Sequence, residues 1–158
     1  MLLSQQQENI MSNEYKNILV AIDLSEDSRK VLMRAKEIAA RNKHAKLSVV
    51  HTLEPLGFAY GGDIPMDLTS IQDQLDAHAR SRLKELLEGI DIPEENQHVL
   101  VGMPDTETHR LANEQAIDLI VVGSHGRHGF QLLLGSVSTG VLRGSPCDVL
   151  AVRVGKKN

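Results

Sequence analysis

The sequence predicts an α/β fold, an open parallel sheet with helices on both of its faces. Short apolar runs alternate along the chain with longer segments in which apolar residues recur at helical spacing. Five runs of the first kind and four segments of the second kind follow one another, without an internal repeat or an interdomain linker. The chain has 158 residues, which is enough for one domain with a buried core.

The first predicted elements lie in the amino-terminal third of the chain. "KNILVAID" at 16–23 is typical of a strand that is buried on both faces. A helix follows it, with Ser25 as the expected N-cap and apolar residues spaced three and four apart. "KLSVVHTL" at 46–53 predicts the second strand, and three glycines and two prolines in 54–66 predict a loop.

The later elements continue the alternation. A stripe of leucines in the helix at 67–88 is explained by packing on the sheet, and Gly89 is expected to close this helix. Gly144 is expected to close the last helix. The predicted strands of this part are 97–102, 118–124 and 147–154, and the predicted helices are 67–88, 104–116 and 136–143.

Composition narrows the class of protein. Aromatic residues make up 3% of the chain and tryptophan is missing, so the core must be aliphatic. A net charge of -4 argues against a nucleic-acid binder, which needs a basic surface. No apolar run approaches the roughly 20 residues of a membrane span, and the amino terminus does not resemble a signal peptide. We therefore expect a cytoplasmic protein without membrane insertion, whose lone Cys147 is a buried structural thiol.

The candidate site lies where the strands end. Open parallel sheets bind ligands at the carboxyl ends of their strands, where the strand order reverses. The first strand ends at Asp23, the second at Thr52, and the fourth runs into Gly123, so these ends should share one edge. Asp23 could accept a hydrogen bond from a ribose hydroxyl or bind a metal ion, or it could cap the following helix.

Five glycines crowd the segment after the fourth strand, at positions 123, 126, 129, 135 and 140. Glycine lets the backbone approach phosphate oxygens, and free N–H groups at a helix start favour an anion. The segment is neither a P-loop nor a dinucleotide-binding fingerprint, because it lacks G-K-[ST] and follows the fourth strand. From spacing alone, a phosphate cradle and a plain turn both remain open.

Two other kinds of site are disfavoured. His125 and His128 lie three residues apart, but no cysteine or second acidic pair accompanies them, so a zinc site is not expected. Ser124 directly follows Gly123, so the segment lacks the G-x-S-x-G of a hydrolase nucleophile elbow. His51 is interpreted as a packed or hydrogen-bonded core residue.

These motifs resemble the universal stress protein family, the UspA-like proteins. The resemblance covers about residues 15–154 and is carried by "NILVAIDLSEDS", "LSVVHTLEP", "GMPDTETHRLANEQAIDLIVVGSHGRHGFQLLLGSVSTGVL" and "SPCDVLAVRV". It implies a single Rossmann-like domain over 15–154, a three-layer sandwich with a five-stranded parallel sheet in the order 3-2-1-4-5. Residues 1–14 are then expected to be a disordered extension and 155–158 a short tail.

Many members of this family bind ATP, and the resemblance implies a site for ATP, with Mg²⁺ bound beside it. Asp23 is implied near the ribose and the metal ion. Val122 and Gly123 are implied beneath the ribose. The implied lining of the adenine pocket is Ala21, Ile22 and Thr52. The backbone amides implied at the phosphates belong to Gly126, Gly135, Ser136 and Val137.

The loop between the phosphate glycines leaves two interpretations open. ATP-binding members have nine residues between the second glycine and the final Gly-Ser or Gly-Thr pair, whereas "RHGFQLLL" at 127–134 has eight. Arg127 and His128 could screen phosphate charge, which is an inference from charge alone. The first hypothesis is an ATP-binding stress-response switch with little or no turnover and no catalytic residue. The alternative is a nucleotide-free dimeric interaction module of the same fold.

The last strand predicts a homodimer. "DVLAVRV" at 148–154 is apolar on both alternating faces and would lie at an edge of the sheet. Exposed edges of this type aggregate unless they are covered. Pairing with a symmetric copy covers the edge, and the resemblance implies the same contact. An unknown protein partner is also expected.

Overall fold

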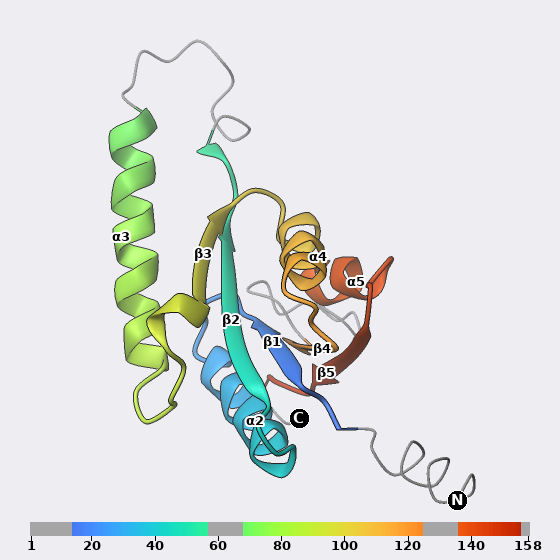
Figure 1. The fold of residues 1–158 in the computed structure, drawn as a ribbon. Coiled ribbons are helices and arrows are strands. Elements are labelled where there is room, and N and C mark those ends of the chain that lie inside the picture. The colour runs from blue at the N-terminus through green and yellow to red at the C-terminus, as the bar shows by residue number, and fades with distance from the viewer. Residues whose placement is uncertain (1–13, 57–67, 125–135, 156–158) are drawn as a thin grey trace, which may run out of the picture.

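A computed structural model describes residues 14–56, 68–124 and 136–155, and Figure 1 shows its fold. Five parallel strands form one sheet in the order β3-β2-β1-β4-β5. The predicted fold class and strand order are therefore confirmed. The strands are β1 Asn17–Ala21, β2 Lys46–Leu53, β3 Gln97–Val101, β4 Leu119–Gly123 and β5 Asp148–Val152.

Helices connect the strands and cover both faces of the sheet. Each predicted helix is present, and its bounds differ from the prediction by a few residues at most. A short 3-10 helix, η2, was not predicted; it spans Glu94–Asn96 just before β3. The α-helices are α2 Ser28–Arg41, α3 Leu68–Leu86, α4 Pro104–Glu114 and α5 Ser136–Leu142.

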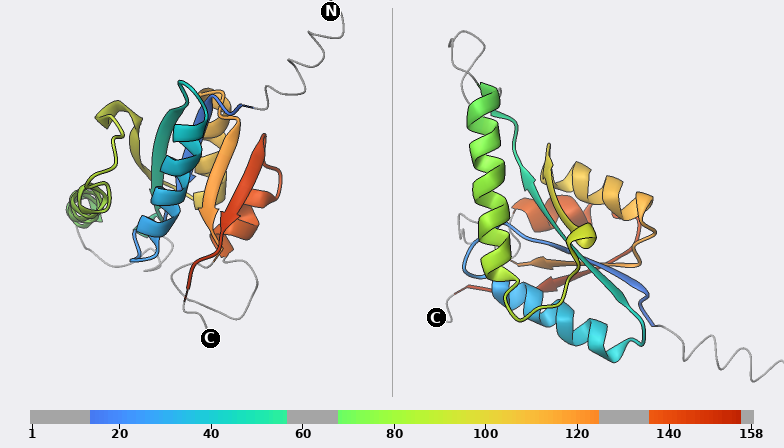
Figure 2. Two further views of the ribbon diagram at one scale, coloured as in Figure 1. Left: turned by 90° about the horizontal axis from the view of Figure 1, so that it is seen from below. Right: turned by 60° about the vertical axis from the view of Figure 1, so that its left-hand side comes forward.

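Two aliphatic clusters build the core, one on each face of the sheet. In the first, Leu32 of α2 and Leu83 of α3 pack with Ile18 and other side chains of the sheet. In the second, Leu111 of α4 and Val141 of α5 pack against the opposite face. Figure 2 shows α2 and α3 on one side of the sheet and α4 and α5 on the other. This is the expected three-layer sandwich.

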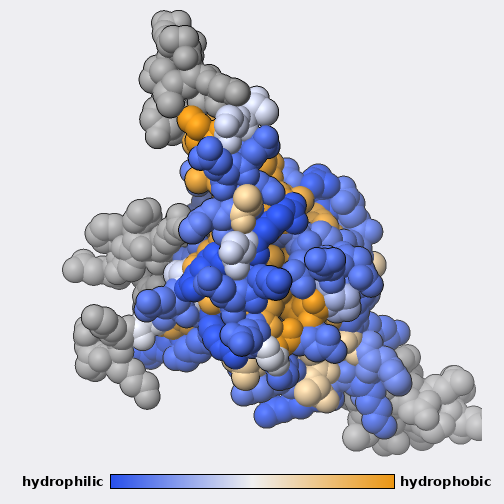
Figure 3. All heavy atoms as spheres, turned by 90° about the vertical axis from the view of Figure 1, so that its left-hand side faces the viewer, coloured by the Kyte–Doolittle hydropathy of each residue, from blue (hydrophilic) through white to orange (hydrophobic). Residues whose placement is uncertain are grey.

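The leucine stripe of α3 serves the sheet, as predicted. Ala79, Leu83 and Leu86 are buried in the first cluster. Figure 3 looks onto this side of the molecule, where most of the outer surface is hydrophilic. Near the start of the helix, Leu75 keeps 38% of its surface exposed. The inward stripe is therefore most deeply buried in the carboxyl-terminal half of α3.

The expected N-cap at Ser25 is wrong. The first residue of α2 is Ser28, and its N-cap residue is Asp27. The Ser25 carbonyl accepts a turn hydrogen bond from the Ser28 N–H at 3.0 Å. The Asp23 carboxylate meanwhile accepts from both serines. Residues 25–27 therefore form a turn stabilised by Asp23, and the helix starts only after it.

Glycines close the two helices that were expected to end this way. Gly89 follows α3 with a φ of 77° and Gly144 follows α5 with a φ of 71°. Both angles lie in the left-handed region that glycine adopts without a steric penalty. Within the described parts of the chain, no helix is long and apolar enough to cross a membrane.

Candidate functional site

The carboxyl ends of the three inner strands meet at one edge, as the sequence predicted. Ala21 at the end of β1 lies opposite Val50 of β2 on one side and Val122 of β4 on the other. The chain leaves β1 for α2 in one direction, and β4 is reached only after two further strands. The strand order therefore reverses between β1 and β4, which is where sheets of this type bind ligands.

Asp23 lies just beyond the end of β1, and only one of its two carboxylate oxygens accepts hydrogen bonds within the described structure. Its Oδ1 accepts from the Ser25 backbone N–H at 3.0 Å and from the Ser28 hydroxyl at 3.0 Å. Its Oδ2 is buried and has no hydrogen-bond partner among the described residues. A buried carboxylate oxygen without a donor is unfavourable by roughly 1–3 kcal/mol or more. This atom is therefore the clearest sign of a missing donor or cation.

The residue after Asp23 has an unusual backbone. Leu24 has a φ of 63°, a left-handed conformation that costs about 1–2 kcal/mol for a residue with a side chain. Leu24 is only 8% exposed, and it belongs to the core cluster of α2 and α3. Burying a leucine contributes about 1.5–3 kcal/mol, so the core contact offsets the strained backbone. The turn that carries Asp23 is thus anchored in the core.

His51 of β2 is a buried hydrogen-bonded residue, as interpreted from the sequence. The residue is 8% exposed, and its Nδ1 lies 2.9 Å from the carbonyl oxygen of Ile22. Because a carbonyl only accepts, Nδ1 carries the hydrogen of this bond. The Ile22 N–H in turn donates to Val50 O at 3.0 Å. His51 therefore fixes the carbonyl that precedes Asp23.

The predicted adenine and ribose residues divide into two groups. Ala21, Ile22 and Val122 are at most 8% exposed and their side chains lie in the core clusters. They could therefore meet a ligand mainly through their backbone. Thr52 and Gly123 are half-buried at the ends of β2 and β4. The structure brings all five to the carboxyl edge of the sheet.

The predicted phosphate residues are only partly within the described structure. Gly126 and Gly135 lie outside the described residues, as do Arg127, His128 and the His125 of the disfavoured zinc site. Ser136 and Val137 form the first turn of α5.

Gly140 has a packing explanation. A Cβ atom at this position would lie 3.0 Å from the Cβ of Asp105. Helices α4 and α5 therefore touch closely at Gly140. At least one of the five clustered glycines serves helix packing.

Ser124 has a structural role that its sequence context did not reveal. Its N–H donates to Val152 O at 2.8 Å, and its hydroxyl accepts from the Val154 N–H at 3.1 Å. The residue is 7% exposed. The hydrogen bonds of Ser124 therefore connect the end of β5 and the residues after it to the end of β4. This contact favours a structural serine over a nucleophile.

A metal ion bound by Asp23 would find few other protein ligands nearby. Among the described residues, no group of three or more His, Cys, Asp and Glu side chains lies close enough together to bind one. A Mg²⁺ ion accepts one carboxylate together with phosphate oxygens and waters. The donor set of this edge therefore suits a cation that arrives with a phosphorylated ligand.

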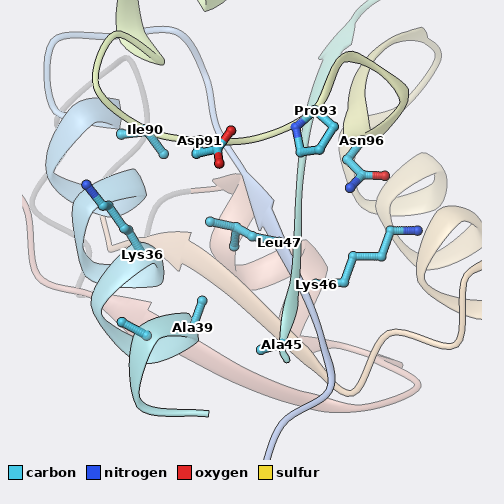
Figure 4. A pocket seen from close by; sticks show the side chains of 10 residues that line it. Lys36, Ala39, Ala45, Lys46, Leu47, Ile90, Asp91, Pro93 and Asn96 are labelled. Atoms are coloured by element: carbon cyan, nitrogen blue, oxygen red, sulfur yellow. The ribbon is translucent and has the colours of Figure 1, made fainter. Parts of the chain in front are cut away.

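A hollow of about 440 Å³ lies elsewhere, near the amino end of β2. Figure 4 shows it between the end of α2, the start of β2 and the segment before β3. Leu47 and Ile90 contribute to its apolar lining, and Lys36 and Lys46 stand among the lining residues. Lys36 Nζ also donates to Gly89 O at 3.1 Å. This hollow contains none of the predicted site residues.

Comparison with known proteins identifies the family. The sequence model that describes the universal stress protein family matches residues 14–153 of the chain. The chain belongs to this family. Universal stress protein A homologs 1 and 2 of Coxiella burnetii are 46% and 43% identical to it over 140 and 146 residues. These matches cover 87% and 90% of the chain, and 96% and 97% of the two homologs. The resemblance drawn from the motifs is confirmed.

Solved universal stress proteins share the fold. UspA from Lactobacillus plantarum has a TM-score of 0.76 at 24% identity, and the match covers 90% of this chain and 100% of that one. A universal stress protein solved in complex with cAMP has a TM-score of 0.59 at 30% identity. That match covers 89% of this chain and 98% of the other.

Proposed function

We propose that this universal stress protein binds an adenine nucleotide, ATP with Mg²⁺ in the first instance, at the carboxyl edge of β1, β2 and β4. The observation that carries the proposal is the buried Oδ2 of Asp23, which lacks a partner among the described residues at the point where the strand order reverses. A further support is the related universal stress protein that was solved with cAMP.

Asp23 would recognise the ribose side of the nucleotide. A ribose hydroxyl is a donor that satisfies Oδ2 directly, and a phosphate-bound Mg²⁺ is the alternative partner. Ala21, Ile22 and Thr52 would line the adenine pocket. Val122 and Gly123 would lie beneath the ribose. The ligand would therefore lie across the ends of three strands whose positions the sheet register fixes.

The glycine segment would hold the phosphates. Glycine residues permit close backbone approach, and free N–H groups bind phosphate oxygens. The spacer of eight residues makes this the part of the site that differs from the ATP-binding pattern. The proposed amide donors are those of Gly126, Gly135, Ser136 and Val137.

We propose a switch in the stress response rather than an enzyme. We assign binding roles to the residues of this site and a catalytic role to none of them. Hydrolysis of the bound nucleotide would therefore be slow or negligible. We place the protein in the cytoplasm as a homodimer joined through its last strand, and a protein partner would sense the nucleotide state. The competing proposal, a dimeric interaction module, differs in requiring no nucleotide.

Replacing Asp23 by Asn tests the nucleotide site. The Asn side chain retains an Oδ1 acceptor for Ser25 and Ser28 but puts an NH₂ donor in place of Oδ2. Losing a hydrogen bond to a charged group costs about 1.5–3 kcal/mol, so the Kd for ATP should rise at least about tenfold. Calorimetric titration of ATP and Mg²⁺ into stripped protein measures this change.

Asp27→Asn is the matched control, because it removes the same charge from an exposed residue of the same turn whose side chain makes no capping bond. It should bind ATP like the wild type. Unchanged affinity in Asp23→Asn would remove Asp23 from the site. A wild-type protein that binds no nucleotide would favour the interaction module.

A further inference from the structure

The turn that carries Asp23 is held from a distant helix as well as from the sheet. Arg82 of α3 donates from Nε to the carbonyl oxygen of Leu24 at 3.3 Å. Arg82 and Leu24 are 58 residues apart in the sequence. The guanidinium also donates from one terminal nitrogen to Glu85 at 3.1 Å, and its side chain is 33% exposed. The Arg82 side chain thus contacts the turn and remains partly exposed to solvent.

Arg82 and Asp23 form hydrogen bonds with the two ends of the same peptide group. The carbonyl of Leu24 and the N–H of Ser25 belong to one planar unit. The carbonyl accepts from Arg82 at 3.3 Å, and the N–H donates to Asp23 Oδ1 at 3.0 Å. A cationic donor on a carbonyl polarises the peptide and strengthens its N–H as a donor. The hydrogen bond from Arg82 is therefore linked to the Asp23 carboxylate through one peptide group.

The peptide in question needs such support. Leu24 is in the left-handed region with a φ of 63°, so the plane that follows it is held in an orientation an isolated chain would avoid. His51 fixes the preceding carbonyl at Ile22, and the Ser28 hydroxyl donates to the same Asp23 oxygen as Ser25. The two serine contacts occupy Oδ1 of Asp23, whereas its Oδ2 has no partner among the described residues.

We propose that Arg82 is a positioning residue of the nucleotide site, which orients the Asp23 carboxylate through the Leu24–Ser25 peptide group. This inference rests on the proposed nucleotide binding at Asp23. It also links helix α3 to the site. A displacement of α3 would release the Leu24 carbonyl and loosen the carboxylate that faces the ligand.

The test measures ATP and Mg²⁺ binding by calorimetry in three single variants of α3. Arg82→Gln should weaken binding about tenfold, and Arg82→Lys should recover part of that loss because it restores a cationic donor. Arg80→Gln is the matched control, since Arg80 pairs with Asp76 on the exposed side of the same helix. It should leave the affinity within twofold of the wild type. Circular dichroism of each variant checks that the fold is retained.

Combining Arg82→Gln with Asp23→Asn separates positioning from a general loss of structure. If Arg82 acts through Asp23, its substitution should weaken binding much less when Asp23 is already Asn. Faster hydrogen exchange of the Ser25 amide in Arg82→Gln and Arg82→Lys is the second readout, and it needs no ligand. An Arg82→Gln protein that binds as the wild type does, or an equal loss in both backgrounds, would overturn the inference. Failure of the wild type to bind ATP would overturn the proposed function itself.

Discussion

Buried polar atoms without partners distinguish the candidate site from the rest of the core. In the described residues they are Asp23 Oδ2, Ser48 Oγ, Gln72 Nε2 and Gln115 Oε1. Ser48 is 0% exposed inside β2, out of reach of any ligand. Asp23 differs from the other three because its free oxygen belongs to a carboxylate. A carboxylate oxygen is a stronger acceptor than a hydroxyl or an amide oxygen, and hydrogen bonds to charged groups contribute more than neutral ones, so the unpartnered Oδ2 of Asp23 marks the site.

His98 gives the fold a dependence on pH. Burial first, and then the nearby Lys46, lower the pKa of His98 below its ordinary value of 6.5. Gln115 Nε2 lies 3.3 Å from His98 Nε2, and it can donate to this nitrogen when the ring is neutral. The unfolded chain therefore takes up this proton at a higher pH than the folded chain, and stability falls as the pH drops below about 6.5.

Urea denaturation at pH 7.5 and pH 5.5 measures this effect. The wild type should lose more stability between the two conditions than His98→Gln, which cannot be protonated. The other histidines contribute equally to both proteins, so the difference belongs to His98. Equal losses in the two proteins would show that His98 does not destabilise the fold at low pH.

Sequence patterns could locate Asp23 but not the contacts that shape it. A buried strand that ends in an acidic residue is visible in "KNILVAID". The hydrogen bond from Arg82 and the left-handed backbone of Leu24 depend on how α3 packs against the sheet. An arginine in a predicted amphipathic helix does not by itself indicate such a contact. The same holds for Ser124, whose hydroxyl accepts from a residue 30 positions later.

At the scale of elements, β5 is an edge strand of the sheet that suits pairing with a partner. It pairs with β4 on one side only in the described structure. Val149 and Ala151 pack towards one core cluster, and Leu150 and Val152 towards the other, and all four remain half-buried. A strand with apolar side chains on both faces and a free edge suits pairing with a second copy.

Substitution of Arg153 by Pro tests the proposed dimer. The Arg153 side chain is exposed, and its N–H makes no hydrogen bond within the described structure. Proline there should leave the fold intact but remove a donor from the free edge. Light scattering should find twice the chain mass of 17.4 kDa for the wild type and for the control Arg153→Ala, which keeps the N–H.

The Arg153→Pro protein should shift towards the monomer at the same concentration. Thermal melting of the two variants checks that proline has not unfolded the domain. A monomeric wild type, or a dimer indifferent to proline, would contradict the proposed contact through β5.

Periodicity predicted every strand and α-helix of the described structure, because aliphatic runs and helical stripes reflect burial directly. The errors lie at the ends of elements. The start of α2 moved from Ser25 to Ser28 because Asp23 organises the intervening turn. The 3-10 helix at Glu94–Asn96 was missed, since three residues are too few to show a period.

At the scale of the whole molecule, the two ends of the sheet differ in chemistry. The carboxyl edge carries Asp23 and the residues proposed to bind the nucleotide. The other end holds the hollow near Lys46, whose lining includes aliphatic side chains and two lysines. Chain direction explains the difference, because at the carboxyl edge the chain leaves the neighbouring strands β1 and β4 towards helices on opposite faces of the sheet. The sequence predicted this edge, while the hollow depends on the packing of α2 against the segment before β3.

The most direct test of nucleotide binding is the content of the purified protein. Freshly purified protein would be denatured and the released small molecules identified by chromatography and mass spectrometry, and stripped protein would then be titrated with ATP and Mg²⁺. We predict released adenine nucleotide or rebinding with a micromolar Kd, about -8 kcal/mol. An empty protein without detectable rebinding would contradict the account, and would mean that the clustered glycines shape a loop while the function lies in the dimer and its partners.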